Sequence, residues 1–499
     1  MKILKKFGET ALIIDIVFAL LARESMRMIF FDSLFVYLSN SFLINLKSMR
    51  NLGMTFLIEF PKQQKMLRQL CFKSPLLQVC RRASSSNAAR KSDDKPHTEY
   101  YIEREKKYGA HNYKPLPVVI EKGKDVFVWD VEGKRYFDFL SAYSAVNQGH
   151  CHPRLLEVMR QQAEILTLTS RAFYNNVLGE YEEYITQLFG YQKVLPMNSG
   201  VECCETAVKL ARRWAYDVKG VPKNEARIVF AQDNFWGRSI AAVSSSNDPD
   251  SYNGFGPFVP NFDAVPYNNL QALEKAISKR NVAAFMLEPI QGEAGVVVPD
   301  EGYLQKVRAL CTKHNVLMIA DEVQTGLGRT GRMLACDHEN VRPDIVTLGK
   351  ALSGGMYPVS AVLADDHIML NIKPGQHGST YGGNPLACKV AMEALQIILD
   401  EKLAENADAM GKILRKEIKK SGLKSITGVR GKGLLSAILI HPNVDAWKVC
   451  LKLRDNGLLA KNTHGHIIRF APPLTIKEEH VREAASIIVD TLREFEQNF

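Results

Sequence analysis

The sequence lacks the cysteine spacing of a secreted, disulfide-stabilised protein. Its nine cysteines, at positions 71, 80, 151, 203, 204, 311, 336, 388 and 450 of the 499 residues, form no C-x-x-C pair. This spacing favours free thiols in a reducing compartment over disulfides or cysteine-rich zinc sites. Two histidines alternate in "GHCHP" (149–153), but no further ligand set stands nearby. We therefore interpret that stretch as a structural turn and expect no metal.

The body of the chain, residues 97–499, also lacks an excess of basic residues. Residues 1–96 hold 16 of the 64 Lys and Arg residues but only 7 of the 54 Asp and Glu residues, so nearly all of the net charge of +10 lies there. The rest of the chain is close to neutral. Nucleic-acid binding needs a basic surface, so we expect no nucleic-acid partner.

No uninterrupted apolar run is long enough to cross a bilayer. The apolar stretches 11–22 and 28–46 are broken by Asp15 and Asp32, whereas a membrane span needs about 20 apolar residues. No stable membrane association is expected, and residues 1–65 stay unexplained. Our hypothesis is that translation starts at Met66, or that residues 1–65 are an upstream extension of the gene.

A mitochondrial transit peptide is indicated directly after that extension. Residues 66–92 carry six basic and no acidic residues, with serines towards the end. This composition is typical of transit peptides, which do not belong to the fold. We assign 66–96 to this segment and expect the mature protein in the mitochondrial matrix.

The body alternates short apolar runs with helical patterns and has no internal repeat or long low-complexity linker. This alternation predicts an α/β fold with a mostly parallel central sheet. We predict strands near 226–232, 283–290, 316–323 and 343–349, a strand–turn–helix over 191–217, and a hairpin over 125–139. We also predict helices over 301–314, 386–419 and 477–496. The expected domains are a large one over 151–390 and a smaller α+β one formed by 97–150 and 391–499.

One lysine stands out in "DIVTLGKALSGG" (344–355), where Lys350 follows a strand and a glycine. A lysine after a strand is most often a solvated surface residue. A phosphate-binding P-loop needs a glycine where Asp344 stands and Ser or Thr where Ala351 stands, so that pattern is absent. The remaining interpretation is a lysine amine that attacks a carbonyl.

Polar residues follow other predicted strands, where an α/β sheet binds its ligands. Asp321 ends one apolar run and Glu288 another, and "NSGVE" (198–202) places backbone N–H groups at a helix start, which suits an anion. "NFWGR" (234–238) adds aromatic rings and an arginine, and "HGSTYGGNP" (377–385) is a second loop able to hold phosphate. Pyridoxal 5'-phosphate, with an aldehyde, a ring nitrogen and a phosphate, fits this combination.

Several motifs resemble the class III, fold type I aminotransferases. They are "GVECCETAVKLAR", "FMLEPIQGEAGVVVP", "IADEVQTGLGRTG", "LGKALSGGMYPVSAV" and "HGSTYGGNPLA". "YGAHNYKPLPV", "SAYSAVNQGHCHP" and "RDNGLLAKNTHGHIIRFAPPL" are similar to the mitochondrial, ornithine-specific members of that family. The resemblance covers about 97–499 and implies a fold type I, pyridoxal-phosphate-dependent transferase with a large and a small domain. It also implies a homodimer, or a higher homo-oligomer, with a shared active site.

The resemblance implies cofactor roles at specific positions. Lys350 matches the lysine that forms the Schiff base and moves the proton, and Asp321 the carboxylate partner of the ring nitrogen. By the same resemblance, Gln324 would bond the ring hydroxyl and Phe235 would stack on the face of the ring. Gly200 and Val201 would bind the phosphate, and Ser379 and Thr380 would reach the phosphate from the other subunit. The family usually has small residues where Cys203 and Cys204 stand, so oxidation sensitivity is a hypothesis.

The resemblance also implies how substrates are chosen. Arg238 matches a permanent carboxylate anchor, since guanidinium binds carboxylate in a two-pronged fork. Arg469 matches a second arginine used only by glutamate and 2-oxoglutarate, and Glu293 the carboxylate that shields it while ornithine binds. Tyr113 and Tyr143 match residues at the distal end of ornithine. The alternatives are an acetylornithine or 4-aminobutyrate aminotransferase, or a catalytically silent protein on this fold.

Overall fold

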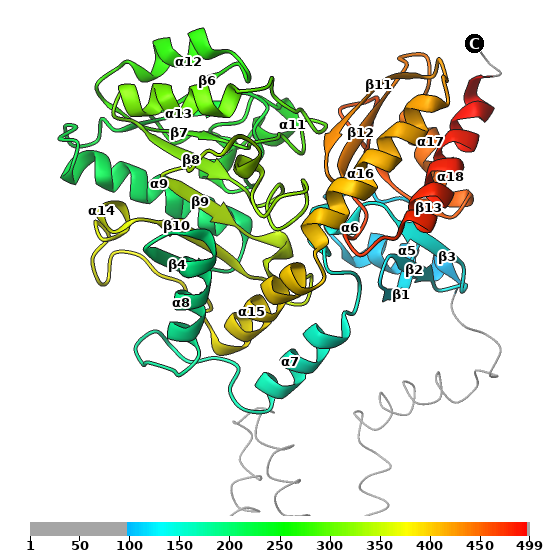
Figure 1. Ribbon diagram of the computed structural model, residues 1–499, viewed down its shortest axis with the longest axis horizontal. Coiled ribbons are helices and arrows are strands. Elements are labelled where there is room, and N and C mark those ends of the chain that lie inside the picture. Colours follow the sequence, from blue (N-terminus) through cyan, green and yellow to red (C-terminus); the bar gives the residue numbers. More distant parts are fainter. Residues whose placement is uncertain (1–96, 497–499) are drawn as a thin grey trace, which may run out of the picture. The chain divides into compact units, whose positions relative to one another are not determined.

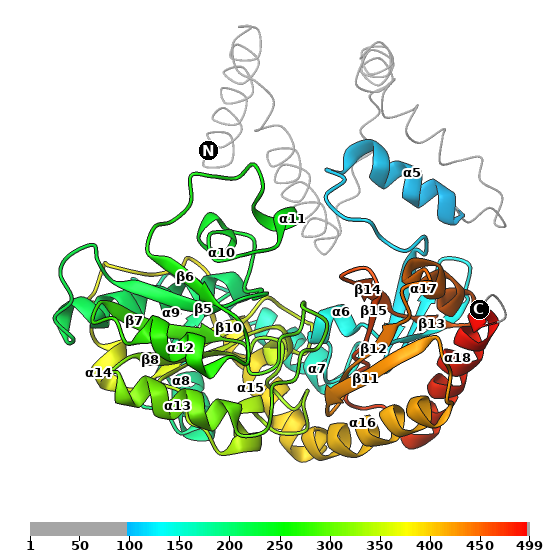
Figure 2. The same ribbon diagram turned by 90° about the horizontal axis from the view of Figure 1, so that it is seen from above.

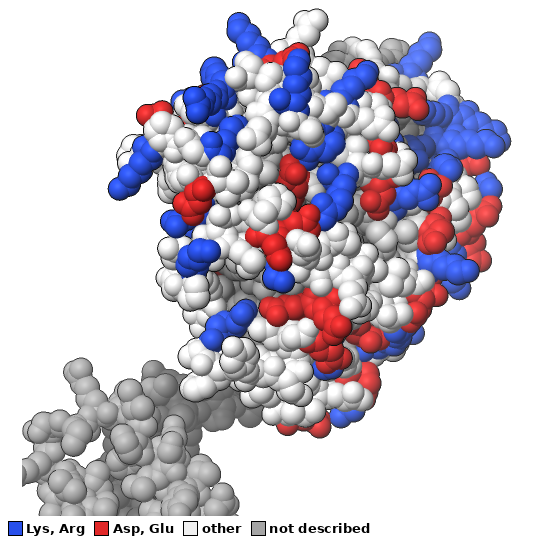
Figure 3. All heavy atoms as spheres, turned by 60° about the vertical axis from the view of Figure 1, so that its left-hand side comes forward, with Lys and Arg blue, Asp and Glu red and all other residues white. Residues whose placement is uncertain are grey.

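The computed structural model describes residues 97–496, and the expectations for residues 1–96 lie outside that range. Figure 1 shows two groups of elements in the described chain, one around a large sheet and one with the C-terminal helices. No helix of the described residues is long and apolar enough to span a membrane. On the face shown in Figure 3, acidic and basic side chains lie side by side, in keeping with a near-neutral body.

The large sheet has seven strands in the order β4-β10-β9-β8-β7-β5-β6. Its strands are β4 (Lys193–Met197), β5 (Arg227–Ala231), β6 (Phe262–Val265), β7 (Val282–Leu287), β8 (Leu317–Asp321), β9 (Ile345–Leu348) and β10 (Ser360–Ala364). The pairs from β9 through β8, β7 and β5 to β6 are parallel, whereas β10 runs antiparallel to both β9 and β4. The predicted strands and the mostly parallel sheet are therefore confirmed.

Both faces of this sheet are covered by helices, which is why its interior strands, such as β7 and β8, are buried along their whole length rather than on alternate residues. In β5, Ile228 and Phe230 pack with α9 (Gly200–Asp217), while Val229 and Ala231 belong to the cluster formed with α12 (Leu270–Ile277) and α13 (Tyr303–Lys313). Further helices around this sheet are α7 (Pro153–Ala163), α8 (Leu178–Phe189), α10 (Ile240–Val243), α11 (Pro249–Tyr252), α14 (Asp366–Met369) and α15 (Pro385–Asp400), with the 3-10 turns η1 (Ala335–Glu339) and η2 (Lys350–Ser353).

Two four-stranded sheets form the second group. One has the order β11-β12-β15-β14 and the other β1-β2-β3-β13. Their bounds are β1 (Ile120–Lys124), β2 (Phe127–Asp130), β3 (Arg135–Asp138), β11 (Ile426–Lys432), β12 (Leu435–Ile440), β13 (Leu458–Leu459), β14 (Lys461–Thr463) and β15 (Ile467–Phe470), with helices α5 (Thr98–Tyr108), α6 (Ser141–Ser144), α16 (Leu403–Lys420), α17 (Ala446–Asp455) and α18 (Glu478–Glu496).

The N-terminal and C-terminal segments meet in this second group. β13 pairs in parallel with β3, and Figures 1 and 2 show the blue and cyan strands beside the orange and red elements. The antiparallel pairing of β2 with β3 confirms the predicted hairpin. A smaller α+β unit built from both ends of the body is therefore present, as predicted.

The single helix predicted over 386–419 is wrong. The chain forms α15 and α16, separated by Glu401 and Lys402, and Lys402 has a left-handed backbone with φ 51°. A residue in that conformation cannot continue a right-handed helix. Both segments have apolar helical periodicity, so the pattern alone did not reveal the break. The domain boundaries stay a prediction, and the one placed at 390/391 falls within α15.

The "GHCHP" turn is held by protein contacts. His150 Nε2 lies 2.7 Å from Asp138 Oδ2, and His152 Nδ1 accepts a hydrogen bond from Arg154 N at the start of α7. Among the described residues, seven cysteines are free thiols, and Cys151 in this turn is the exposed one.

Candidate active site

Lys350 lies just beyond the carboxyl end of β9, an interior strand of the large sheet. Its backbone has φ 43°, an unusual left-handed conformation for a residue with a side chain, and it directly precedes a buried turn of small residues. Such strain persists where the surrounding structure determines it, and it is common at functional sites. Burial lowers the pKa of the Lys350 amine, although the carboxylates of Glu293, Asp321 and Glu288 act in the opposite direction. The surroundings therefore increase the neutral, nucleophilic fraction of this amine.

The start of α9 presents backbone N–H groups beside this lysine. Ser199 caps the helix: its hydroxyl accepts from Glu202 N, while the Glu202 carboxylate accepts from Ser199 N at 2.8 Å. Gly200 and Val201 are the next residues and open the helix towards the cavity. A helix start of this kind binds anions through its first N–H groups and the positive end of its dipole.

Asp321 ends β8 and is almost fully buried. Burial raises the pKa of its carboxyl, while hydrogen bonds from Val323 N, Cys204 and Thr347 and the charge of Lys350 act against this rise. A buried carboxylate with several donors is held in one orientation. It is suited to pairing with a cationic group that enters the cavity.

These groups surround one cavity of about 230 Å³. Six of the predicted cofactor residues line it: Gly200, Val201, Phe235, Asp321, Gln324 and Lys350. Five further lining residues were not assigned a role from the sequence: Cys204, Trp236, Gly237, Glu288 and Val323. The start of α9, the ends of the strands and the aromatic loop therefore meet at this cavity, as expected at the carboxyl edge of a parallel sheet.

Close backbone approach at this cavity depends on two glycines. A Cβ on Gly292 would lie 1.7 Å from Gln324 Oε1, and one on Gly237 would lie 2.4 Å from Val201 Cγ2. Neither distance is sterically possible. These glycines let the loops after β5 and β7 close against Val201 and Gln324.

Glu288 connects two loops of the site. Its Oε1 accepts a hydrogen bond from Phe235 N (3.1 Å) and its Oε2 one from Gly292 N (3.0 Å). Burial, followed by the nearby Asp321 carboxylate, raises the pKa of Glu288 to about 8. The sequence showed this residue at a strand end but gave no sign that it holds both the aromatic loop and the loop of Glu293.

This pKa predicts a pH-dependent stability. Between the ordinary value of 4.5 and about 8, Glu288 is ionised in the unfolded chain but keeps its proton in the folded one. Its contribution to stability therefore falls as pH rises through this window, by up to about 1.4 kcal/mol per pH unit. Glu288→Gln cannot ionise, so its melting temperature should change less between pH 6 and pH 8 than that of the parent, measured without added ligand.

Glu293→Gln is the matched control for this measurement. Burial alone would raise the pKa of Glu293, but the charges of Arg469 and Lys350, with hydrogen bonds from Arg469 and Gln324, hold it below its ordinary value. Glu293 is then ionised in both states between pH 6 and pH 8. Its variant should keep the parent's pH slope, and a parent slope in Glu288→Gln as well would contradict the assignment.

Glu293 and Arg469 form an ion pair at the edge of the site. Arg469 Nη1 lies 2.9 Å from Glu293 Oε1 and also donates to Gly292 O at 2.9 Å, and the arginine side chain is only 5% exposed. Gln324 Nε2 donates to the same Glu293 oxygen at 3.4 Å, and the Tyr143 ring centre lies 5.0 Å from the Arg469 guanidinium carbon. The structure therefore brings the predicted arginine and its carboxylate into direct contact.

None of the five predicted substrate residues is among those that line the cavity, and two of them, Arg238 and Tyr113, are exposed. Arg238 is exposed, with its guanidinium 5.4 Å from the Phe235 ring centre and 2.9 Å from Ser251 Oγ. Tyr113 is 81% exposed but close enough to raise the pKa of Tyr143, after the larger effects of burial and Glu293.

The predicted phosphate residues of the second loop also lie outside the cavity lining. Ser379 Oγ accepts hydrogen bonds from Asn198 Nδ2 (2.7 Å) and Gly382 N (3.1 Å), and Thr380 is exposed. The loop is attached to its own α9 because His377 contacts both Thr206 and Lys209 at 2.8 Å. A single chain thus does not bring Ser379 and Thr380 to its own cavity.

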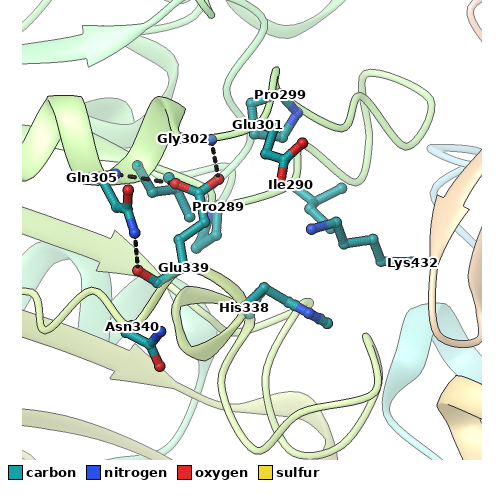
Figure 4. Close-up of a pocket in the computed structure, with 12 residues that line it drawn as sticks. Pro289, Ile290, Pro299, Glu301, Gly302, Gln305, His338, Glu339, Asn340 and Lys432 are labelled. Carbon is teal, nitrogen blue, oxygen red and sulfur yellow. Dashed lines mark hydrogen bonds between the residues drawn. The ribbon is translucent and has the colours of Figure 1, made fainter.

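A different cavity of about 390 Å³ lies near the start of α13 (Figure 4). Glu339 already caps that helix, since its carboxylate accepts from Gly302 N and Gln305 N at 3.2 and 3.1 Å. His338 contacts the Thr330 carbonyl at 2.9 Å. The cavity shares no lining residue with the Lys350 site and lacks its combination of amine, aromatic ring and buried carboxylate.

Comparison with known proteins identifies the family. The sequence pattern of the family "Aminotransferase class-III" matches residues 108–492. A mitochondrial ornithine aminotransferase of Rattus norvegicus is 67% identical over 417 residues, which cover 83% of this chain and 95% of that protein. The chain belongs to the class III aminotransferases.

Solved structures agree with this assignment. The chain is similar to the ornithine aminotransferase of Toxoplasma gondii ME49, with a TM-score of 0.81 and 46% identity over 84% of this chain and 99% of that one. It is also similar to the acetylornithine aminotransferase of Elizabethkingia anophelis, with a TM-score of 0.73 and 57% identity over 80% of this chain and all of that one. The fold is thus that of the fold type I transferases, as the motifs implied.

The cofactor of class III aminotransferases is pyridoxal 5'-phosphate, and the cavity of this chain fits it. Gln324 Oε1 is a buried acceptor for which the described residues supply no donor, which suits a ring hydroxyl. Lys350 offers an amine to an aldehyde, Phe235 an aromatic face, and Asp321 a carboxylate to a ring nitrogen. The start of α9 offers N–H groups to a phosphate.

Proposed function

We propose that this class III aminotransferase is an ornithine δ-aminotransferase. It transfers the side-chain amino group of L-ornithine to 2-oxoglutarate. The products are L-glutamate and glutamate 5-semialdehyde, which cyclises to pyrroline-5-carboxylate. The observation that carries the proposal is the Glu293–Arg469 pair beside Lys350, together with the similarity to ornithine aminotransferases over most of the chain.

The two substrates impose opposite demands on one site. Ornithine reacts through its side-chain amine, so no carboxylate lies next to the reacting carbon, whereas glutamate reacts through its α-amine and brings one there. An exposed arginine at that position would favour α-amino acids with either substrate. We propose that Glu293 neutralises Arg469 while ornithine binds and releases it for glutamate, and that Arg238 anchors the distal carboxylate in both cases. Tyr113 and Tyr143 would contact the distal end of ornithine.

The cofactor supplies an electron sink when bound, because its protonated ring accepts the electrons left when a C–H proton leaves the substrate. We propose that Lys350 holds the aldehyde carbon and moves that proton, acting as general base and acid. Asp321 keeps the ring nitrogen protonated, Phe235 covers the ring, and Gln324 accepts from its hydroxyl. Gly200 and Val201 bind the phosphate through their N–H groups.

We propose a homodimer with a shared active site. Ser379 and Thr380 lie outside the cavity of their own chain, and Thr380 is exposed, which supports their reaching the phosphate of a second subunit. The mitochondrial names of the relatives and the transit-like segment 66–96 support a location in the mitochondrial matrix.

The visible absorption spectrum tests the function. Purified protein loaded with pyridoxal phosphate should be yellow, and ornithine without a keto acid should bleach that band. Acetylornithine and 4-aminobutyrate are the matched controls, and neither should bleach it. Bleaching by acetylornithine instead would favour the alternative raised by the Elizabethkingia structure, and a protein that binds no cofactor would contradict the family activity altogether.

A further inference from the structure

The two oxygens of Asp321 have different surroundings. Oδ1 accepts hydrogen bonds from Val323 N and from the Thr347 hydroxyl, both at 3.1 Å. Oδ2 accepts one from the thiol of Cys204 at 3.4 Å. The two side-chain donors are themselves in contact, with Cys204 Sγ 3.6 Å from Thr347 Oγ1. The carboxylate is therefore held by a three-residue side-chain network that joins α9, β8 and β9.

Cys204 is the weak member of this network. A thiol is a poor hydrogen-bond donor compared with a hydroxyl or a backbone N–H. Cys204 is fully buried, and burial, with smaller effects from Cys203 and Asp321, raises the pKa of its thiol, so the sulfur keeps its proton and acts as a donor. Oδ2 is thus oriented by a donor that withdraws little charge from it.

The adjacent Cys203 acts on the Cys204 thiol but contacts neither Asp321 nor Thr347. It is equally buried on the same helix, but its thiol donates to Gly200 O at 3.0 Å and Leu348 O at 3.6 Å. It is also not among the residues that line the cavity, whereas Cys204 is. The chain therefore contains two neighbouring buried thiols, of which one contacts Asp321 and the other contacts backbone carbonyls.

We propose that Cys204 is a positioning residue that orients Asp321 towards the cofactor ring nitrogen and, as a weak donor, leaves Oδ2 basic enough to keep that nitrogen protonated. The inference rests on the proposed binding of pyridoxal phosphate in this cavity. Its physical basis is competition at one atom: a strong donor on Oδ2 would stabilise the carboxylate and weaken its pull on the ring proton. Without the Cys204 donor, the carboxylate would be held through Oδ1 alone, which fixes the direction of Oδ2 less firmly.

The experiment compares Cys204→Ala and Cys204→Ser with Cys203→Ala in the holoenzyme. Two quantities are measured: the dissociation constant of pyridoxal phosphate, and the ¹⁵N chemical shift of the cofactor ring nitrogen labelled with ¹⁵N, which reports its protonation. Cys204→Ala should weaken cofactor binding by about 2- to 10-fold, the effect of one hydrogen bond. Cys204→Ser should restore binding but move the nitrogen shift towards the unprotonated form. Cys203→Ala should change neither.

The outcomes separate this proposal from a structural role. If Cys204→Ala and Cys203→Ala lower the melting temperature alike and neither changes the nitrogen shift or cofactor affinity, Cys204 only fills space and the proposal is wrong. If Cys204→Ser leaves the nitrogen shift at the parent value, donor strength at Oδ2 does not matter and the proposal is equally wrong. Binding of pyridoxal phosphate to the parent protein is measured first. A parent protein that binds none would overturn the proposed function itself, before any variant is compared.

Discussion

Lys350→Ala is expected to abolish transamination, with turnover falling by on the order of 10⁴-fold or more, because general acid–base catalysis and covalent attachment are lost together. No other lysine lines the described cavity, so no neighbouring amine can replace it. The visible band of the cofactor bound to the protein should change at the same time. Turnover with ornithine and 2-oxoglutarate and the absorption spectrum are the measurements.

Lys219 provides a matched control. Burial lowers its pKa to about 8, as burial also lowers that of Lys350. Its amine, however, donates to Val282 O (2.7 Å) and Asn315 O (2.5 Å), at the amino ends of the strands and away from the cavity. Lys219→Ala should lower the melting temperature but keep turnover within a few-fold. Substantial turnover in Lys350→Ala would show that this lysine has no part in the chemistry.

Glu293→Ala is expected to change which amine the enzyme prefers. In the parent, the Glu293 carboxylate neutralises an Arg469 side chain that is almost fully buried. Without it, the guanidinium keeps its bond to Gly292 O but faces the substrate unpaired, which favours amines that carry an α-carboxylate. The ratio of kcat/KM for glutamate to kcat/KM for ornithine should rise by about 10- to 100-fold, which corresponds to about 1.4 to 2.7 kcal/mol of transition-state stabilisation.

The complementary variant separates the two half-reactions. Arg469→Ala should still accept the amino group of ornithine but should react poorly with glutamate and 2-oxoglutarate. Only glutamate and 2-oxoglutarate bring a carboxylate to this position. Single-turnover bleaching and recovery of the cofactor band measure each half-reaction alone. Glu293→Gln keeps the side-chain volume, so it serves as a second variant for the same test if Glu293→Ala folds poorly.

Arg430→Ala is the control for this pair. Arg430 donates from Nε (2.9 Å) and Nη2 (2.6 Å) to Gly295 O, so it holds the same loop without touching Glu293. Its loss should lower stability and leave the preference ratio unchanged. A ratio that stays constant in Glu293→Ala, or that moves equally in Arg430→Ala, would mean that the loop rather than the ion pair sets substrate choice.

Much of this site could be predicted from local patterns because parallel strands place their carboxyl ends at one edge. Lys350 and Asp321 were found at the ends of apolar runs, and the helix start was predicted from the stretch "NSGVE" (198–202). Glu288 and Cys204 were not assigned roles. Glu288 accepts from Phe235 N, 53 residues away, as well as from the nearby Gly292 N, and Cys204 contacts an aspartate 117 residues away. Contacts over such separations leave no local signal in the sequence.

The sequence by itself determined the α/β class, the position of the central strands, and the kinds of side chain at the strand ends. These follow from apolar periodicity and turn residues, which act over a few neighbouring positions. The Glu293–Arg469 pair was implied by the family resemblance rather than by a local pattern, and the structure brings the two side chains into contact. Only the tertiary structure decided that Cys204 contacts Asp321 and that the chain bends at Lys402 between α15 and α16. These features depend on contacts between segments far apart in the chain, or on a backbone conformation that packing selects, and neither is encoded in a local pattern.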